Sequence, residues 1–523
     1  MAIPSTKLAA SLAKLRALQA DGRRVLESGE LPRVHRERLG QQGFLRAVMK
    51  GWNIATSPAA EPGDSTPWYA VFWEFCARYC EKRFGKDWYL SPEQSLLLDA
   101  ENTAIPAQVV VYSPKGTNNT LTLLFGTSLY DLKQKQRPPA TDLTVKDGLR
   151  IFVPAAALTK VPENFFARHP VEIQVALAAI KDCSEVLARL LQGGHSVVAG
   201  RLAGAFRRVG RQAVADEIIK TMKGAGYDVR EIDPLAREHV VRPLPQGAAP
   251  IVGRIQALWA SLRGAAMEGF PPAPGLPKDK KAYLRFVDDI YQSDAYHSLS
   301  IEGYRVTPEL IERVRAGNWN PDLSEADRQS RDALAARGYW QAFQQVKDAV
   351  AKIIAGSAPG VLARTAHRDW YRELFAPSVT AGLIGAAALA GYRNAPVLIQ
   401  GSRHVPPRAE VVPDAMSTLF DLLEGETEPC VRAVLVHWLF GYIHPYIDGN
   451  GRMARFLMNA MLASGGYPWT VIRVDDRVAY LRALESASVD GDIGPFAAFI
   501  AERVRWSIEQ AKTAKEQAKA AKK

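Results

Sequence analysis

Cysteine is scarce in this sequence, and long apolar runs are missing. Its 523 residues include four cysteines and no CxxC pair, which excludes a disulfide scaffold and favours burial of these thiols over a metal or redox role. No stretch approaches the roughly 18 apolar residues that a membrane span requires. The first residues also lack the apolar core of a signal peptide. The sequence therefore predicts a cytoplasmic protein with no membrane partner.

What is present is an ordinary globular composition with an excess of positive charge. Hydrophobic residues make up 47% and charged residues 23% of the chain, values typical of soluble proteins. A chain of this length is too long to fold around one hydrophobic core, and its length suggests about three domains. The net charge of +11 favours acidic partners, nucleic acid or phosphorylated ligands, although only weakly in a large chain.

The positive charge is concentrated at the N-terminus. Residues 1–57 hold ten Lys and Arg against four acidic residues, and helical spacing there gives way to two strands around Lys50-Gly51. Helices followed by a basic hairpin suit a winged helix that contacts DNA phosphates. A helical module with a solvated basic face explains the pattern equally well. The expected DNA-contacting residues are Arg33, Arg36, Arg38, Arg46 and Lys50.

Residues 1–57, with "WYLSPEQSLLLD" and "IPAQVVVYSPKG" after them, resemble the AbiEi antitoxin family. That resemblance implies a winged helix over 1–57 and a mixed α/β region over 58–242. Proline and glycine are dense over 243–277, around one short helical stretch, which predicts a linker. The pattern is then strongly helical over 278–505, and 506–523 reads as a solvated basic tail.

The stretch "HPYIDGNGRMAR", His444–Arg455, concentrates the residues that carry chemistry. An apolar helix precedes it, and His444 must end that helix because Pro445 disfavours the α conformation before it. A second helix is expected to begin near Gly451. Backbone amides at a glycine-rich helix start bind anions, and the loop is therefore expected to bind phosphate.

The charged residues of this stretch fit nucleotide chemistry. Arg452 and Arg455 are unfavourable at a helix N-terminus but suit a phosphate clamp. Asp448 beside phosphate would need a cation, and a carboxylate with phosphate oxygens commonly holds Mg²⁺. His444 has an ordinary pKa near 6.5 and could remove a proton from an attacking hydroxyl. The residues together predict nucleotidyl transfer.

This stretch resembles the HPFx(D/E)GNGRxxR signature of Fic-domain proteins, with Tyr446 in place of phenylalanine. The resemblance extends over roughly 280–500 and implies a mainly helical domain that transfers AMP from ATP to a protein hydroxyl. It implies His444 as the base and Asp448 as the Mg²⁺ ligand. The phosphate and ATP contacts that it implies are Gly449, Asn450, Gly451, Arg452 and Arg455.

Upstream, "HSLSIEG" places Ser298 and Glu302 on one helix face, which Gly303 can terminate. This resembles the inhibitory pattern (S/T)xxxE(G/N) of the family and implies an inhibitory helix near 291–303. In the family that glutamate pairs with the second motif arginine, here Arg455, and blocks placement of the γ-phosphate.

The strand-like "PVLIQGS" from Pro396 to Ser402 predicts an edge hairpin. Such a flap would dock an extended target segment by strand addition, a role that the family resemblance supports. The alternative is a hairpin that merely closes the pocket. The flap residues expected to contact the target are Val397, Leu398 and Ile399.

The expected fold is multidomain and mainly α: a helical Fic domain with a small β-hairpin flap, preceded by a winged helix and a mixed α/β domain. The expected function is autoinhibited protein adenylyltransfer, with ATP as substrate, Mg²⁺ as cofactor and an unspecified protein target. Two alternatives stay open. One is deAMPylation or another nucleotidyl or phosphoryl transfer on the same scaffold. The other is a DNA-binding toxin–antitoxin regulator whose Fic domain senses nucleotide. Homodimerisation is also left open.

Overall fold

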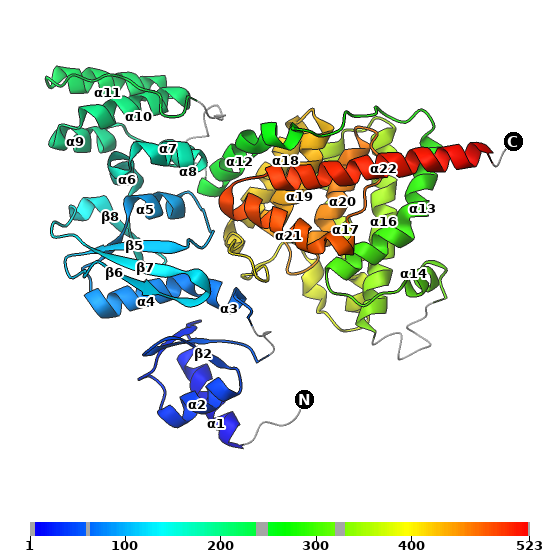
Figure 1. Ribbon diagram of the computed structural model, residues 1–523, viewed down its shortest axis with the longest axis horizontal. Coiled ribbons are helices and arrows are strands. Elements are labelled where there is room, and N and C mark those ends of the chain that lie inside the picture. The colour runs from blue at the N-terminus through cyan, green and yellow to red at the C-terminus, as the bar shows by residue number, and fades with distance from the viewer. Residues whose placement is uncertain (1–5, 59–62, 237–248, 319–329, 521–523) are drawn as a thin grey trace. The chain divides into compact units, whose positions relative to one another are not determined.

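A computed structural model describes residues 6–58, 63–236, 249–318 and 330–520 (Figure 1). The chain divides into two compact units. The first is Met1–Pro250 with Leu398–Val405, and the second is Ile251–Val397 with Pro406–Lys523. Across the described residues, no helix is long and apolar enough to cross a membrane. The fold is multidomain and mainly helical, as the sequence predicts.

The first unit begins with two helices and a small antiparallel sheet of order β1-β3-β2. The β2–β3 hairpin turns at Lys50-Gly51, as predicted. Val25 and Ile54 from this sheet share a hydrophobic core with Phe75 of the following helix, whereas Leu15 and Leu39 belong to a smaller core within residues 1–57. The elements are α1 (Thr6–Leu18), β1 (Val25–Glu27), α2 (Arg33–Gln41), β2 (Leu45–Met49) and β3 (Trp52–Ala55).

A four-stranded sheet of order β4-β5-β7-β6 follows, in which β5 and β7 are parallel and the other pairs antiparallel. A separate hairpin, β8–β9, comes after it. The strands are β4 (Tyr89–Leu90), β5 (Gln108–Ser113), β6 (Asn119–Thr122), β7 (Ser128–Lys133), β8 (Leu143–Lys146) and β9 (Leu149–Phe152). The helices of this region are α3 (Thr66–Tyr69), α4 (Phe72–Phe84) and α5 (Pro92–Asp99).

In the described part of the first unit, six further helices share one apolar core with α5. One of them, over 196–208, approaches the following chain closely through two glycines: a Cβ on Gly200 would lie 1.9 Å from the Arg230 carbonyl oxygen, and one on Gly204 would lie 2.1 Å from the Ile232 carbonyl oxygen. The helices are α6 (Pro154–Lys160), α7 (Glu163–Arg168), α8 (Pro170–Ala179), α9 (Ser184–Gly193), α10 (Ser196–Arg208) and α11 (Gln212–Gly224).

The described part of the second unit is helical and contains no strand. Its helices are α12 (Pro250–Met267), α13 (Lys280–Ile301), α14 (Pro308–Arg315), α16 (Arg331–Ile354), α17 (Pro359–Thr380), α18 (Val412–Gly425), α19 (Pro429–Ile443), α20 (Asn450–Ala463), α21 (Arg477–Glu485) and α22 (Gly494–Ala520). The almost wholly buried α19 and α20 form its centre. Helix α16 packs tightly on α17. A Cβ on Gly338 would lie only 2.0 Å from the Leu374 carbonyl oxygen, so glycine permits this close approach. Helix α22 runs on through the described part of the expected tail, 506–523.

Residues 243–248 of the expected linker over 243–277 lie outside the described residues, and the linker contains one packed helix. Helix α12 occupies 250–267 and is packed in the second unit: Arg254 donates to the Tyr442 hydroxyl of α19 across 2.8 Å, and Arg263 pairs with Glu426 at 2.8 Å. Pro250 begins this helix, and Gly253 and Gly264 lie within it without interrupting it. Residue 250 is the boundary between the units.

Candidate active site

His444 ends helix α19 in a left-handed conformation, with φ 52° and ψ 58°. Its Nδ1 lies 3.1 Å from the Gly441 carbonyl oxygen. Because a carbonyl can only accept, Nδ1 carries the proton, and the neutral ring leaves Nε2 as a free base. The half-buried imidazole is thus held by the helix end with its basic nitrogen available.

The loop between α19 and α20 is fixed by Asn450. Its side chain accepts from the Tyr446 N–H at 3.0 Å and donates to the Tyr446 carbonyl at 2.8 Å. Gly449 precedes α20 with φ 82°, and a Cβ there would lie 2.7 Å from Phe375. Glycine is therefore required for both conformation and space. The loop brings the N-terminal turn of α20, which favours anions, next to His444.

Arg452 lies in that first turn and is almost fully buried, with 1% of its side chain exposed. Its guanidinium lies between the rings of Tyr304 and Phe375, at 5.1 and 5.0 Å from their centroids. Its Nε and Nη2 have no hydrogen-bond partner among the described residues, and Nη2 lies 3.5 Å from Asp448. A buried guanidinium with unused donors is suited to an anionic ligand.

Arg455, one turn later, contacts both residues of the upstream helix. Its Nε donates to the Ser298 hydroxyl at 2.8 Å, and Nη2 donates to the Ser298 carbonyl at 3.1 Å and to Glu302 Oε1 at 2.6 Å. Helix α13 ends at Ile301, and Gly303 follows with φ 84°. The helix end and the pairing with Arg455 are both as expected from the sequence.

The Glu302 carboxylate lies against the first turn of α20. A Cβ on Gly451 would lie 2.2 Å from Glu302 Oε1 and 3.3 Å from Arg455 Nη1. A negative charge is favourable at a helix N-terminus. Glu302 therefore occupies the position in which this helix start would hold a phosphate.

The electrostatics of the site keep His444 neutral and Glu302 ionised. Burial lowers the pKa of His444; the bond to Gly441 opposes this, and the charge of Arg393 adds to it. Burial would raise the pKa of Glu302, but the positive charges of Arg455 and Arg452 outweigh it and hold that pKa below its ordinary value. Glu302 itself raises the pKa of Arg455 against the effect of burial.

The Fic/DOC family model matches residues 362–462, from α17 through α20. Residues 362–462 are a Fic domain. Protein adenylyltransferase Fic of Nematostella vectensis is 42% identical over 122 residues, which are 23% of this chain and 28% of that protein. The protein of the same name in Drosophila willistoni is 39% identical over 115 residues, which are 21% and 22% of the two chains. This chain thus spans about a quarter of the length of these relatives.

Among solved structures, Fic-1 from Caenorhabditis elegans matches at 17% identity with a TM-score of 0.38, over 63% of this chain and 93% of that chain. A score this low supports no inference about the arrangement of the whole chain. The resemblance of the first 57 residues to AbiEi antitoxins stays a prediction. Ser298 and Glu302 lie outside the Fic match and reach the domain through α13.

Sequence reasoning missed Arg393, which is buried beside the loop between α19 and α20. Its Nε donates to the His444 carbonyl at 2.8 Å, and its main-chain N–H donates to the Pro445 carbonyl at 2.8 Å. The same guanidinium also donates to the carbonyls of Ala395 and Pro407. Burial lowers its pKa to about 10. Arg393 thus holds His444 through the backbone, a role that no local sequence pattern reveals.

The flap differs from the predicted hairpin. Residues 396–402 form no strand, and a turn lies at Gln400-Gly401. The chain passes from the second unit to the first between Val397 and Leu398, and within the first unit His404 forms one bridge with Ala104. A β-branched run gains a hairpin only when a partner strand is present. Leu398 is exposed, whereas Val397 and Ile399 are partly buried.

Tyr446, which replaces the usual phenylalanine of the motif, is buried and stacks on Tyr371 with centroids 3.7 Å apart. Its hydroxyl has no hydrogen-bond partner among the described residues. The sequence indicates that this added hydroxyl needs a partner, and the described part of the chain supplies none.

The basic N-terminal residues are mostly engaged within their own unit. Arg36, Arg38 and Arg46 each donate hydrogen bonds to main-chain carbonyls. Arg33 is 81% exposed but pairs with Glu37 at 2.6 Å. Lys50 is exposed at the hairpin turn. DNA binding by these residues stays a prediction, and Arg33 and Lys50 are the two most accessible to phosphate.

Proposed function

We propose that this chain is a protein adenylyltransferase that transfers AMP from ATP to a hydroxyl side chain of another protein. The observation that carries this proposal is a neutral His444, with a free Nε2, beside a helix N-terminus that holds two buried arginines. The names of the relatives that match the Fic domain support the same activity.

The proposed reaction is one displacement at phosphorus. The target hydroxyl oxygen forms a bond to the α-phosphorus of ATP, the bond to the bridging oxygen breaks, and pyrophosphate leaves. His444 Nε2 accepts the hydroxyl proton, which a neutral imidazole can do. The amides at the start of α20, with Arg452 and Arg455, stabilise the negative charge of the phosphates.

Asp448 is proposed to hold Mg²⁺ together with ATP. Its side chain is 57% exposed, and no group of three or more His, Cys, Asp or Glu side chains suited to a metal occurs in the described part of the chain. One accessible carboxylate fits Mg²⁺, which commonly takes one or two carboxylates and completes its shell with substrate phosphates and water. When bound, the ion would neutralise phosphate charge.

We further propose that Glu302 keeps the enzyme inhibited. Its carboxylate pairs with Arg455 and lies against Gly451, which is where the terminal phosphates of ATP would be placed in the mechanism above. Bound in that position, ATP must either displace an ionised carboxylate or adopt a pose in which His444 does not meet the α-phosphorus. The second outcome is unproductive binding.

The test is transfer of label from [α-³²P]ATP to lysate proteins by Glu302→Gly and by Glu302→Gly with His444→Ala. The single variant should label protein, and the added loss of the base should reduce labelling by about 10²–10⁴-fold. ATP binding, measured by calorimetry, should be similar in both because His444 contacts the attacking hydroxyl. Equal labelling by the two variants would contradict the proposal.

A further inference from the structure

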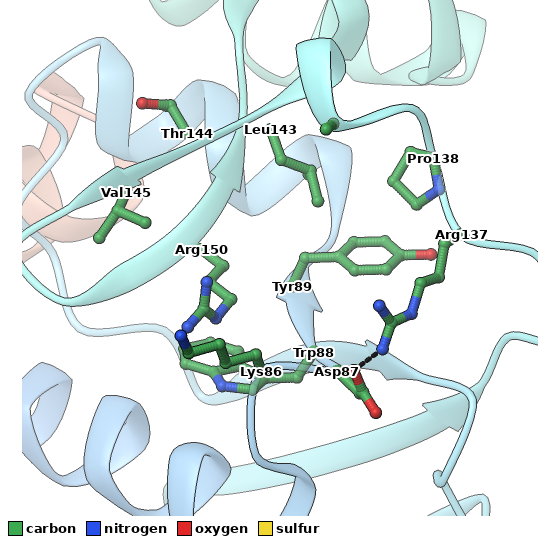
Figure 2. Close-up of a pocket in the computed structure, with 11 residues that line it drawn as sticks. Lys86, Asp87, Trp88, Tyr89, Arg137, Pro138, Leu143, Thr144, Val145 and Arg150 are labelled. Atoms are coloured by element: carbon green, nitrogen blue, oxygen red, sulfur yellow. Dashed lines mark ion pairs between the residues drawn. The ribbon is translucent and has the colours of Figure 1, made fainter.

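The first unit contains a cavity of about 310 Å³ between the start of β4, the loop before β8 and the β8–β9 hairpin (Figure 2). This volume lies at the lower end of the range for small-molecule sites. All of its lining residues lie between 86 and 150, and the Fic domain supplies none of them. The lining residues that matter here are Lys86, Tyr89, Arg137, Leu143 and Arg150.

Several hydrogen-bond donors of this cavity are unused. Arg150 Nε is buried without a hydrogen-bond partner among the described residues. The Lys86 ammonium and the Tyr89 hydroxyl likewise have no ion pair or hydrogen bond within the described ranges. Figure 2 shows the Tyr89 hydroxyl directed towards Arg137, with Lys86 and Arg150 on the other side of the ring. Burial raises the pKa of Tyr89 to about 12, so this hydroxyl remains a donor at neutral pH.

The charge of the lining is positive on balance. Three of its residues are cations and one, Asp87, is an anion. Asp87 is shared between Arg137 and a lysine outside the lining, Lys115, which lies 3.1 Å away. Arg150 is paired at 3.3 Å with Glu81, whose side chain is 50% exposed. Ion pairs this accessible are weak, and an incoming anion can therefore replace them.

The remaining wall is apolar. Leu143 and Pro138 face the cavity together with the Tyr89 ring (Figure 2), and the partly exposed hairpin brings Val145 to its edge. A bare inorganic anion would leave this wall in contact with water, whereas a ligand with a flat apolar body would cover it. The cavity thus combines a cationic part with an apolar part.

We propose that this cavity binds a nucleotide-like ligand, with its phosphates on Lys86 and Arg150 and its planar body against Leu143. The ligand class follows from the lining: unused donors on cationic side chains select phosphate, and the apolar wall selects a base over a free anion. This site is independent of the Fic domain and of the activity proposed for it.

The test is hydrogen–deuterium exchange of the full-length chain with ATP, adenosine and inorganic triphosphate as separate probes. Exchange is read peptide by peptide, which separates this cavity from the Fic domain. ATP should slow exchange over 86–90 and 143–152, and adenosine and triphosphate should each do so far less at equal concentration. Protection confined to 444–455 would overturn the proposal, and so would equal protection by triphosphate or by adenosine alone.

Variants tie that protection to the named side chains. Arg150→Gln should raise the ATP concentration for half-protection by about tenfold, the scale of one lost charge-assisted hydrogen bond. Lys86→Gln should also raise the ATP concentration for half-protection. Lys86 is exposed, so this variant tests the proposal even if Arg150→Gln misfolds. Lys133→Gln removes an exposed charge outside the cavity and should change nothing. If both cavity variants match Lys133→Gln, the proposal is wrong.

Discussion

Arg455 donates a 2.6 Å hydrogen bond to Oε1 of Glu302, and the same oxygen lies 2.2 Å from where a Cβ of Gly451 would be. One carboxylate therefore binds an arginine and lies at a helix N-terminus at the same time. Both are groups to which a phosphate would bind. A nucleotide that needs either group must compete with Glu302.

Glu302→Gly is expected to raise AMP transfer above wild type by about tenfold or more. A tenfold change corresponds to about 1.4 kcal/mol, which is reasonable for a pair in which Arg455 is buried and Glu302 is 28% exposed. Glu302→Gln keeps the size of the side chain and loses its charge, so its rate of AMP transfer should lie between those of wild type and Glu302→Gly. Label transfer from [α-³²P]ATP, with folding checked by circular dichroism, is the measurement.

A Glu302→Gly variant that is less active than wild type, with folding unchanged, would give Glu302 a part in the reaction. It would favour removal of AMP, with the carboxylate orienting water. A preparation of AMP-modified protein would then distinguish the two reactions directly.

Ser298→Ala should activate the enzyme more weakly than Glu302→Gly. The Ser298 hydroxyl accepts from Arg455 Nε at 2.8 Å, and the Arg455–Glu302 bond would survive its loss. The variant leaves one buried guanidinium nitrogen without that acceptor, so Arg455 is held less firmly. The activity of Ser298→Ala is measured by the same transfer assay, and Ser300→Ala on the same helix is the matched control. Activation equal to that of Glu302→Gly would mean that Ser298 is what holds Glu302 in place.

The motif residues of the site could be predicted from sequence because they are contiguous and each follows a local rule. Pro445 forces His444 to end its helix, and Gly449 takes the positive φ that starts the next one. The contact with Glu302 spans 153 positions, and helical spacing with a family resemblance still identified it. These features depend on neighbours in the chain or on a pattern repeated within one helix.

Other features depend on tertiary packing and have no such signal. Arg393 meets the carbonyls around His444 only through the fold, and Tyr304 and Phe375 enclose Arg452 from two different segments. Around α12, prolines and glycines suggested a linker with one short helical stretch, and nothing local showed that this helix packs through Trp259. The cavity of the first unit likewise joins residues from segments about 50 positions apart.

Asp294→Asn should stabilise the protein at pH 8 and lose that advantage as the pH falls towards 5. Burial raises the pKa of Asp294 to about 6 from its ordinary value, and the side chain accepts from the Tyr339 hydroxyl at 2.7 Å. A raised carboxyl pKa means that the folded state binds more protons than the unfolded state between about pH 4 and 6. Stability from this group is therefore fully present below about pH 4 and is lost as the pH rises through about 6.

Asparagine removes that dependence because it has no charge to bury and can still accept from Tyr339. The expected gain at pH 8 is of order 1–3 kcal/mol, since two pKa units correspond to about 2.7 kcal/mol. Urea unfolding of both proteins at several pH values measures it, and Asp288→Asn, at a more exposed position on the same helix, serves as the control. A stability difference that does not vary with pH would show that Asp294 is ionised throughout.

Arg393→Gln should lower kcat with little change in the KM for ATP, because Arg393 acts through His444 and contacts no phosphate in the proposed mechanism. The guanidinium donates to the carbonyls of His444, Ala395 and Pro407, and a glutamine amide cannot reach all three. Loss of about tenfold in kcat is expected from a base that is no longer held in place. The assay is best run in the Glu302→Gly background, where transfer is measurable.

The pH profile separates this positioning role from a purely structural one. The positive charge of Arg393 lowers the pKa of His444, so its removal should raise that pKa and move the acid limb of the kcat profile to higher pH. Any added exposure of the imidazole acts in the same direction, because burial also lowers its pKa. Arg393→Lys keeps the charge but not the fork of donors; it should lose kcat while its acid limb stays near that of the parent. An acid limb unmoved in Arg393→Gln would mean that Arg393 only supports the loop.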